Sequence, residues 1–256
     1  MSSALAMAWH QFRFDQKVFW RNPPAVGFTV LLPVIFLVLL ASIFGGGTIH
    51  HYRIDVDTYY VPAILTLALV SSTMVNLSMS VTIAREDGIL KRGRGTPLPP
   101  WAFMAGRVGN SIVVSLVMLV VVTAIGAIVY GVSVPWSHAG EIAATVAVGA
   151  TSFCALGIAL SGLIPSADAA APITQLIALP LYFISGVFIP QNEIPAGILA
   201  VADVFPMRPL FECFFAIWVP SAGSFDWGNL AVVAAWGVGG FLIAMRTFRW
   251  VPRAAT

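Results

Sequence analysis

The feature that most constrains this chain is a short polar segment, residues 84–107, which lies between two long apolar runs. It contains five of the thirteen basic residues, namely Arg85, Lys91, Arg92, Arg94 and Arg107. A basic loop between two apolar runs is retained on the cytoplasmic side of a membrane, because Lys and Arg resist translocation. The segment therefore predicts a cytoplasmic loop that joins two membrane spans.

The composition of the chain is that of a polytopic membrane protein. Of the 256 residues, 59% are hydrophobic and only 9% are charged, and the mean hydropathy is +0.90. Ordinary globular domains carry about 25% charged residues, so this chain cannot cover a water-exposed surface. The net charge of +2 is too small to indicate a nucleic-acid partner. Two cysteines, Cys154 and Cys213, are too few for a disulfide framework or a Cys-based metal site.

Apolar runs long enough to cross a membrane predict six transmembrane helices. A spanning helix needs about 20 apolar residues. Such runs cover residues 23–44, 59–83, 108–130, 141–163, 169–189 and 227–245. The first run is too long for the apolar core of a secretory signal peptide. The fifth is interrupted by Pro172, Pro180 and the pair Ser185-Gly186, so we expect it to be broken.

Two other regions are predicted to lie at the membrane surfaces. Residues 1–22 mix aromatic and basic side chains, which suits an interfacial helix; a disordered tail is the alternative. Residues 191–227 hold two apolar stretches, 195–204 and 209–218, that are too short to span. They predict short re-entrant helices on the outer side. Arg208 and Glu212 are four residues apart and are expected to pair.

The distribution of basic residues predicts that both termini are cytoplasmic. With the termini and the 84–107 loop inside, eleven of the thirteen basic residues lie in the cytoplasm. Only Arg53 and Arg208 remain outside. We expect residues 1–256 to form a single, all-α transmembrane domain with six spans.

Several kinds of chemistry are not expected in this chain. Neither lysine, Lys17 or Lys91, follows a glycine, so the chain has no P-loop for a nucleotide. The acidic residues Glu141 and Asp168 stand at span ends, so ion coupling through charged mid-span groups is not expected. All histidines lie in termini or loops, which argues against a metal site or a catalytic centre: His10, His50, His51 and His138. The function that remains is a translocation pathway that is powered or gated by another protein.

The second span carries one polar face. Ser72, Thr73, Asn76 and Ser80 recur at helical spacing on one side. Polar side chains at membrane depth face either other helices or a water-filled cavity. They therefore serve as interhelical hydrogen-bonding groups or as the wall of a cavity, and the sequence leaves both alternatives open.

The polar loop predicts a short helix parallel to the membrane. The carboxylates of Glu86 and Asp87 would be stabilised by the positive, amino-terminal end of its dipole. They would also pair with Lys91 and Arg92 one turn later. Gly88 would allow close backbone approach.

Further along the loop, Gly93 and Gly95 are expected to end this helix and Thr96-Pro97 to begin the next. Such a compact, charged helix can dock in a cleft of a cytosolic partner. A well-anchored loop with solvated charges is the alternative that the residues leave open.

The loop resembles a segment of type-2 ABC exporter permeases. Their pattern is Arg-Glu-x-Gly-Thr-Leu-x-Arg…Arg-x-Thr-Pro-Leu, and this chain has Arg85-Glu86-Asp87-Gly88-Ile89-Leu90-Lys91-Arg92 followed by Arg94-Gly95-Thr96-Pro97-Leu98. It departs from the pattern at Ile89, where Thr is common, and at Gly93, where an apolar residue is common. The Pro-broken fifth span with Phe183-Ile184-Ser185-Gly186-Val187-Phe188-Ile189-Pro190, the short outer helices, Pro206 and the final span are also similar, so the resemblance covers almost the whole chain.

The resemblance implies a permease dimer, formed with an identical or related chain, that carries two cytosolic ATP-binding subunits. The 84–107 loop would form the coupling helix that contacts the ATPase, and the amino-terminal interfacial helix would assist in this contact. The loop's contact with the ATPase would be made by Glu86, Asp87, Gly88, Lys91 and Arg92. ATP and Mg²⁺ would bind in the partner, and this chain would hold no cofactor. The second and fifth spans of both protomers would line the substrate path, with Ser72, Thr73, Asn76, Gln175, Phe183 and Phe188 as candidate residues.

The expected mechanism is that ATP binding moves each coupling helix and tilts the attached second and third spans. This movement would shift an inward-open pathway toward outward release. A path rich in Phe, Leu and Met favours a lipophilic drug, antibiotic or lipid-like cargo, and the resemblance implies a bacterial inner membrane. An ATP-independent channel or a membrane scaffold is the competing class.

Overall fold

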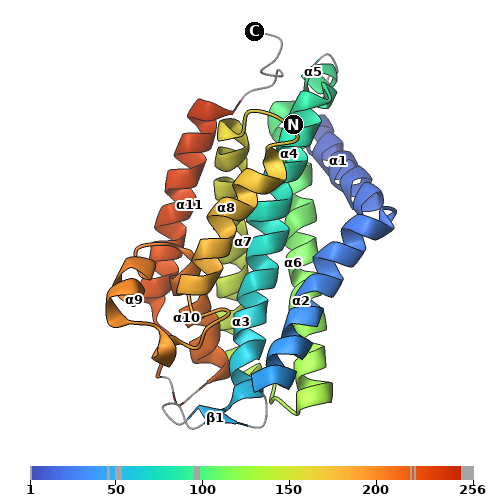
Figure 1. Cartoon of the computed structure of the whole chain (residues 1–256). Coiled ribbons are helices and arrows are strands. Elements are labelled where there is room, and N and C mark those ends of the chain that lie inside the picture. Colours follow the sequence, from blue (N-terminus) through green and yellow to red (C-terminus); the bar gives the residue numbers. More distant parts are fainter. Residues whose placement is uncertain are drawn as a thin grey trace.

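The computed structural model describes residues 2–44, 47–49, 54–94, 99–219, 221 and 223–248 as an all-α bundle with one short ribbon. Figure 1 shows upright helices with α5 at one end and α9, α10 and the ribbon at the opposite end. In the ribbon, β1 (Thr48–Ile49) pairs antiparallel with β2 (Ile54–Asp55). The all-α class predicted from the sequence is confirmed.

The helices follow the predicted order along the chain. They are α1 (Ser2–Trp20), α2 (Pro23–Phe44), α3 (Val56–Val70), the π-helical turn η1 (Ser71–Val75), α4 (Asn76–Glu86), α5 (Ile89–Arg94), α6 (Pro100–Tyr130), the 3₁₀ turn η2 (Trp136–His138), α7 (Ala139–Leu163), α8 (Ala170–Ile184), the 3₁₀ turn η3 (Gln191–Glu193), α9 (Ala196–Ala202), α10 (Met207–Trp218) and α11 (Trp227–Thr247).

Within the described residues, four helices are long and apolar enough to cross a membrane. They cover Val56–Glu86, Trp101–Tyr130, Trp136–Leu163 and Trp227–Thr247. Two shorter apolar helices cover Thr29–Phe44 and Ala170–Ile184. The count of six spans stays a prediction, since it requires both shorter helices to cross as well.

The second span, α3–η1–α4, is the centre of the bundle. Of its most apolar window, 78% is buried inside the protein, against 28% for α6 and for α11. Its first half, α3, packs against α2, α6 and α10, whereas its second half, α4, packs against α7, α8 and α5. The outer helices present apolar side chains, such as Val120 and Ile128 of α6, to the surroundings, as lipid-facing helices do.

Close contact between α7 and α11 depends on glycine. A Cβ atom at Gly237 would lie 2.3 Å from Ser152 Oγ and 2.8 Å from Ser152 Cα, and a Cβ at Gly240 would lie 3.0 Å from Leu156 N. Small residues let helix backbones approach closely in membranes, where the hydrophobic effect does not drive helices together. This packing makes α7 and α11 the most extensive helix pair of the protein.

Residues near the amino terminus form helix α1 rather than the alternative disordered tail. The helix packs on the first turns of α6, where a Cβ at Gly106 would lie 2.7 Å from Gln11 Cγ and one at Gly109 would lie 2.9 Å from Phe12 Cδ2. Its location in the headgroup layer stays a prediction. The predicted loop residues His50, His51 and Arg53, the loop residues Gly95, Thr96 and Pro97, and the terminal Arg249 and Arg253 lie outside the described residues.

The fifth predicted span ends earlier than expected. Its helix, α8, stops at Ile184 instead of 189, because Ser185 caps it and Gly186 takes a φ of +92°, where a side chain is strained. The two predicted short helices are present as α9 and α10, while their re-entrant position stays a prediction. The expected Arg208–Glu212 pair is formed at 3.5 Å, and Arg208 also reaches Asp203 at 3.3 Å and donates to the Leu199 carbonyl at 2.8 Å.

Candidate functional site

The junction between α4 and α5 forms the candidate contact surface for a partner. Glu86 is the last residue of α4 and Asp87 caps it, with Asp87 N donating to Ile83 O at 2.9 Å. Helix α5 starts only after Gly88, where Arg92 N donates to Gly88 O at 3.0 Å. The expectation that Glu86 and Asp87 begin the short helix is therefore wrong, since a tight turn separates them from it.

Gly88 makes that turn possible. Its φ is +68°, in the left-handed region that glycine adopts without strain. A Cβ at this position would meet no atom within 4 Å. No atom of this chain therefore approaches Gly88 closely, and the backbone conformation of the turn is what requires glycine; close approach of a partner at Gly88 stays a prediction.

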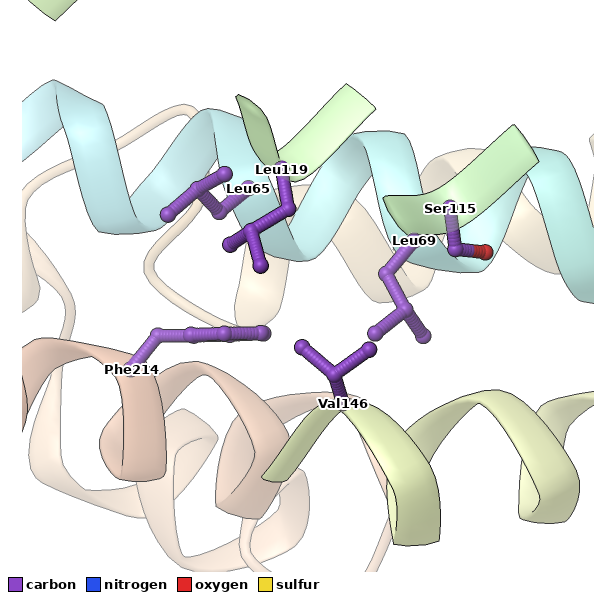
Figure 2. A pocket seen from close by; sticks show the side chains of 6 residues that line it. All are labelled: Leu65, Leu69, Ser115, Leu119, Val146 and Phe214. Atoms are coloured by element: carbon purple, nitrogen blue, oxygen red, sulfur yellow. The ribbon is translucent and has the colours of Figure 1, made fainter. Parts of the chain in front are cut away.

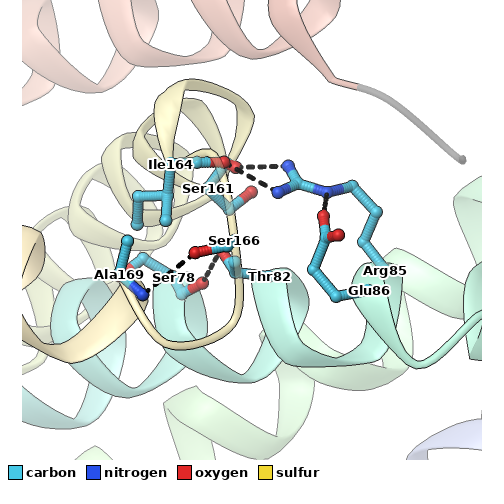
Figure 3. A network of polar contacts seen from close by, with 8 residues as sticks. All are labelled: Ser78, Thr82, Arg85, Glu86, Ser161, Ile164, Ser166 and Ala169. Carbon is cyan, nitrogen blue, oxygen red and sulfur yellow. Dashed lines mark hydrogen bonds and ion pairs between the residues drawn. The ribbon is translucent and has the colours of Figure 1, made fainter. Parts of the chain in front are cut away.

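Arg85 anchors this junction to the rest of the bundle, as Figure 3 shows. Its side chain is 2% exposed, and Nε donates to Glu86 Oε1 at 2.7 Å. Its other two nitrogens donate to the carbonyls that end α7, Nη1 to Ser161 O at 2.8 Å and Nη2 to Ile164 O at 2.7 Å. A guanidinium at a helix carboxyl end is favoured by the negative end of the helix dipole. The planar fork of Arg85 thus fixes the end of α4 against the end of α7.

These contacts correct the predicted charge pairing. Glu86 binds Arg85 rather than Lys91, and Arg92 donates to the backbone carbonyl of Asp87 at 3.3 Å rather than to a carboxylate. In the sequence, Arg85 is one of five basic residues in the 84–107 segment. A usable signal was present, because Arg85 follows Ser78 and Thr82 at helical spacing on one face of the second span.

The two sides of α5 differ in chemistry. Leu90 is buried against Ala84 and Phe103 and holds the helix to the bundle. The side chains that face away from the bundle are Asp87, Ile89, Lys91 and Arg92, all exposed. Glu86 and Gly88, also predicted as contact residues, are only partly exposed. The helix therefore offers a small charged face on a fixed base.

Helix α1 lies against the start of α6 through a second group of charges. Arg107 belongs to α6 rather than to the loop, and its guanidinium lies 5.0 Å above the Phe103 ring. Burial raises the pKa of the Asp15 carboxyl, and the nearby Arg107 charge and the Gln11 hydrogen bond oppose this shift. Both residues are partly buried between α1 and α6, so they contribute to packing more than to the exposed face.

In the second span, the polar residues surround the π-helical turn η1. Its end is marked by Asn76 N, which donates to Ser71 O five residues back. The Ser72 and Thr73 hydroxyls both donate to Leu69 O, at 3.0 and 2.6 Å, and Ser72 Oγ lies 2.8 Å from Ser115 Oγ of α6. Both side chains are fully buried. In this conformation Ser72 bonds to a neighbouring helix, as the interhelical alternative predicts, whereas Thr73 bonds to the backbone of its own span.

The other candidate path residues lie nearer the protomer surface. Asn76 is half-buried on α4, and Gln175 and Phe183 are exposed on α8. Phe188 lies 5.1 Å from Phe183 and 5.2 Å from Phe36 of α2, measured between ring centroids. The structure thus groups the two phenylalanines with α2, apart from the buried pair at η1. The role of all six residues in transport stays a prediction.

Figure 2 shows a small cavity inside the bundle, between α3, α6, α7 and α10. It is lined by Leu65, Leu69, Ser115, Leu119, Val146 and Phe214. Its volume is about 10 Å³, close to the space that a single water molecule needs. Sites for drug-sized ligands measure about 300–1,000 Å³. This cavity therefore cannot hold a drug-sized cargo in the present conformation.

Comparison with known proteins identifies related chains. Residues 5–218 match the family described as ABC-2 type transporter. Over 223 residues, the chain is 26% identical to the daunorubicin resistance ABC transporter permease protein DrrB1 of Streptomyces coeruleorubidus, covering 86% of this chain and 78% of DrrB1. Over 206 residues, it is 23% identical to the "Probable multidrug ABC transporter permease YbhR" of Escherichia coli (strain K12), covering 77% of this chain and 55% of YbhR. The chain thus spans about half the length of YbhR.

Proposed function

This chain belongs to the ABC-2 type transporter family, and on that basis we propose that it is the membrane-spanning permease of an ATP-driven exporter. The relatives in drug resistance and multidrug transport support export of a lipophilic drug, antibiotic or lipid-like molecule. A separate ATP-binding subunit, present in two copies, would bind ATP and Mg²⁺ and supply the energy. The permease would have six spans and cytoplasmic termini in a bacterial inner membrane, and would pair with an identical or related chain.

The observation that carries this proposal is the exposed charged face of α5. Asp87, Lys91 and Arg92 point away from the bundle, while Arg85 and Leu90 fix the base of the helix. A charged helix held in this way can transmit a push from a docked subunit, because Leu90 packs it against α4 and α6. Glu86 contributes indirectly, through its ion pair with Arg85. The turn at Gly88 sets the direction in which α5 leaves α4.

The substrate path would lie between two protomers rather than inside one. The exposed side chains of α8, Gln175 and Phe183, and the half-buried Asn76 and Phe188 are available to such a path. Ser72 and Thr73 are buried in this conformation and would reach the path only after the second span moves.

We expect charge reversal on α5 to separate the exporter from an ATP-independent channel or scaffold. Lys91→Glu should lower recovery of the ATP-binding subunit with the tagged permease about ten-fold, because a charge that complements the partner becomes repulsive. Glu86 is unsuitable for this test, since its reversal would also break the ion pair with Arg85. Recovery is measured by mild-detergent pull-down with mass spectrometry and an ATPase assay.

The matched control is Arg246→Glu, which reverses an exposed charge at the end of α11. It should leave recovery of the subunit unchanged. If Lys91→Glu and Arg246→Glu behave alike, α5 is not the docking surface. A pure permease oligomer with no ATP-binding subunit, isolated from the native membrane, would favour the channel or scaffold.

We also expect Phe183→Ala to reduce efflux of daunorubicin, used as a lipophilic probe, by about two- to ten-fold. The ring is half exposed on α8, so its loss removes an aromatic contact from the path without opening the core. Efflux is followed by fluorescence in cells that express both subunits. Phe241→Ala removes a similarly exposed ring from α11 and serves as the control; equal losses in both variants would contradict the assignment of α8 to the path.

A further inference from the structure

Polar contacts join the second span to residues 161–191 at four levels along the bundle. Nearest α5, Arg85 binds the carbonyls of Ser161 and Ile164, which directly precede the turn into α8 (Figure 3). About two turns further along α4, Ser78 Oγ lies 3.1 Å from Thr174 Oγ1 of α8. Both hydroxyls are fully buried.

The two remaining levels lie toward the opposite end. Ser71 Oγ of η1 lies 2.9 Å from Tyr182 Oη of α8. Beyond the end of α8, Tyr59 Oη donates to Gly186 O at 2.6 Å and accepts from Gln191 N at 3.3 Å. The second span and residues 161–191 are thus joined from the α5 end to the α9–α10 end.

These contacts are suited to transmit movement because their surroundings are apolar. In lipid, apolar packing gives helices little preference for one neighbour over another. A buried hydroxyl or guanidinium that loses its partner finds no water to replace it. Helices joined by such contacts therefore stay together, while neighbours joined only by apolar surface can slide.

Tyr59 is held rigidly enough to position the Gly186–Gln191 turn. Its ring is fully buried and lies against Tyr60, Phe211 and Phe215, with centroids 5.3–5.7 Å apart. The turn that it binds is tight, since Gly186 has a φ of +92° and a Cβ there would lie 3.3 Å from Tyr59 Oη. The phenolic hydroxyl is thus fitted to the Gly186–Gln191 turn.

We propose that the second span and residues 161–191 move as one unit, in which Tyr59 positions the Gly186–Gln191 turn and makes it follow movements of α5. The resemblance to exporter permeases implies that α5 acts on the second and third spans. The proposed unit also includes α8 and the Gly186–Gln191 turn that follows it. A movement of α5 at one membrane surface would therefore change the conformation at the opposite surface. This role rests on the exporter function proposed above.

The test uses the complex of full-length permease and ATP-binding subunit in nanodiscs. A single cysteine at Ile189, which is exposed within the turn, reports the accessibility of the turn through the rate of labelling by a water-soluble maleimide. The native thiols, Cys154 and Cys213, are buried, and the parent chain gives the background rate. Rates are compared without nucleotide and with ATP plus vanadate, and ATP hydrolysis is measured in parallel.

Tyr59→Phe removes only the hydroxyl. It should preserve assembly and ATP hydrolysis, while the nucleotide-dependent change in labelling falls from about three-fold or more to less than about 1.5-fold. Thr66→Val is the matched control, because its buried hydroxyl bonds within α3, to Pro62 O at 2.9 Å. This variant should keep the full change in labelling.

A nucleotide-dependent change in Tyr59→Phe equal to that of the parent overturns the proposed unit. A parent complex that hydrolyses no ATP contradicts the exporter function instead. In that case the unit is judged on nucleotide-free labelling, where Tyr59→Phe should raise the rate at position 189 at least about two-fold and Thr66→Val should not. Equal nucleotide-free rates in both variants then overturn it.

Discussion

Replacing Arg85 with methionine should lower the free energy of unfolding by about 3–5 kcal/mol, the range typical of breaking a buried ion pair. The substitution leaves Glu86 without its partner and removes the donors to Ser161 O and Ile164 O. Methionine fills much of the volume, so the loss reports the polar contacts rather than a cavity. Unfolding is measured by denaturant titration of the purified chain in mixed micelles.

Arg92→Met provides the control for this prediction. Its side chain is exposed and reaches one carbonyl at 3.3 Å, so its loss should change stability by less than about 0.5 kcal/mol. Arg85→Lys should lie between the two, because an ammonium keeps the charge but cannot reach both carbonyls with a planar fork. Equal losses for Arg85→Met and Arg92→Met would show that the anchor does not contribute to stability.

Gly237→Ala should destabilise the bundle by about 1–3 kcal/mol through overpacking. The added methyl would lie 2.8 Å from Ser152 Cα, a backbone atom that cannot move without shifting α7. Gly239→Ala, two residues along the same helix, meets no atom within 4 Å and should be neutral or slightly stabilising. The same micelle titration compares the two variants. A loss at Gly239 as large as that at Gly237 would mean that helix backbone effects, and not the α7 contact, set the cost.

The apolar helices and the Arg208–Glu212 pair could be predicted from the sequence because they depend on local features. Lengths of apolar runs place most helix ends to within a few residues, although α6 begins at Pro100, eight residues before the predicted span. A spacing of four places two side chains together. The early end of α8 at Ile184 was missed, since the φ of Gly186 is set by Tyr59 and Gln191, which are distant in sequence.

The candidate site was less predictable because its contacts are long-range. Arg85 binds carbonyls 76 and 79 residues away, and backbone acceptors leave no trace in a sequence pattern. Ser72 and Thr73 illustrate a second obstacle. A hydroxyl that bonds the backbone within its own protomer and one that lines a path have the same chemistry, so only the position of Leu69 O and Ser115 distinguished them.

The π-helical turn Ser71–Val75 sets the rotational phase between the two halves of the second span. A π turn accommodates one residue more than an α-helical turn, and each residue of an α-helix corresponds to a rotation of about 100°. Deleting one residue here would restore a regular helix and keep this phase, whereas closing the turn to a regular α-helix with all of its residues retained would rotate α4 by about that angle relative to α3. Arg85 would then turn away from α7, and the exposed face of α5 would point in a different direction at that end of the bundle. The length of this one turn therefore determines the direction from which a docked partner can act.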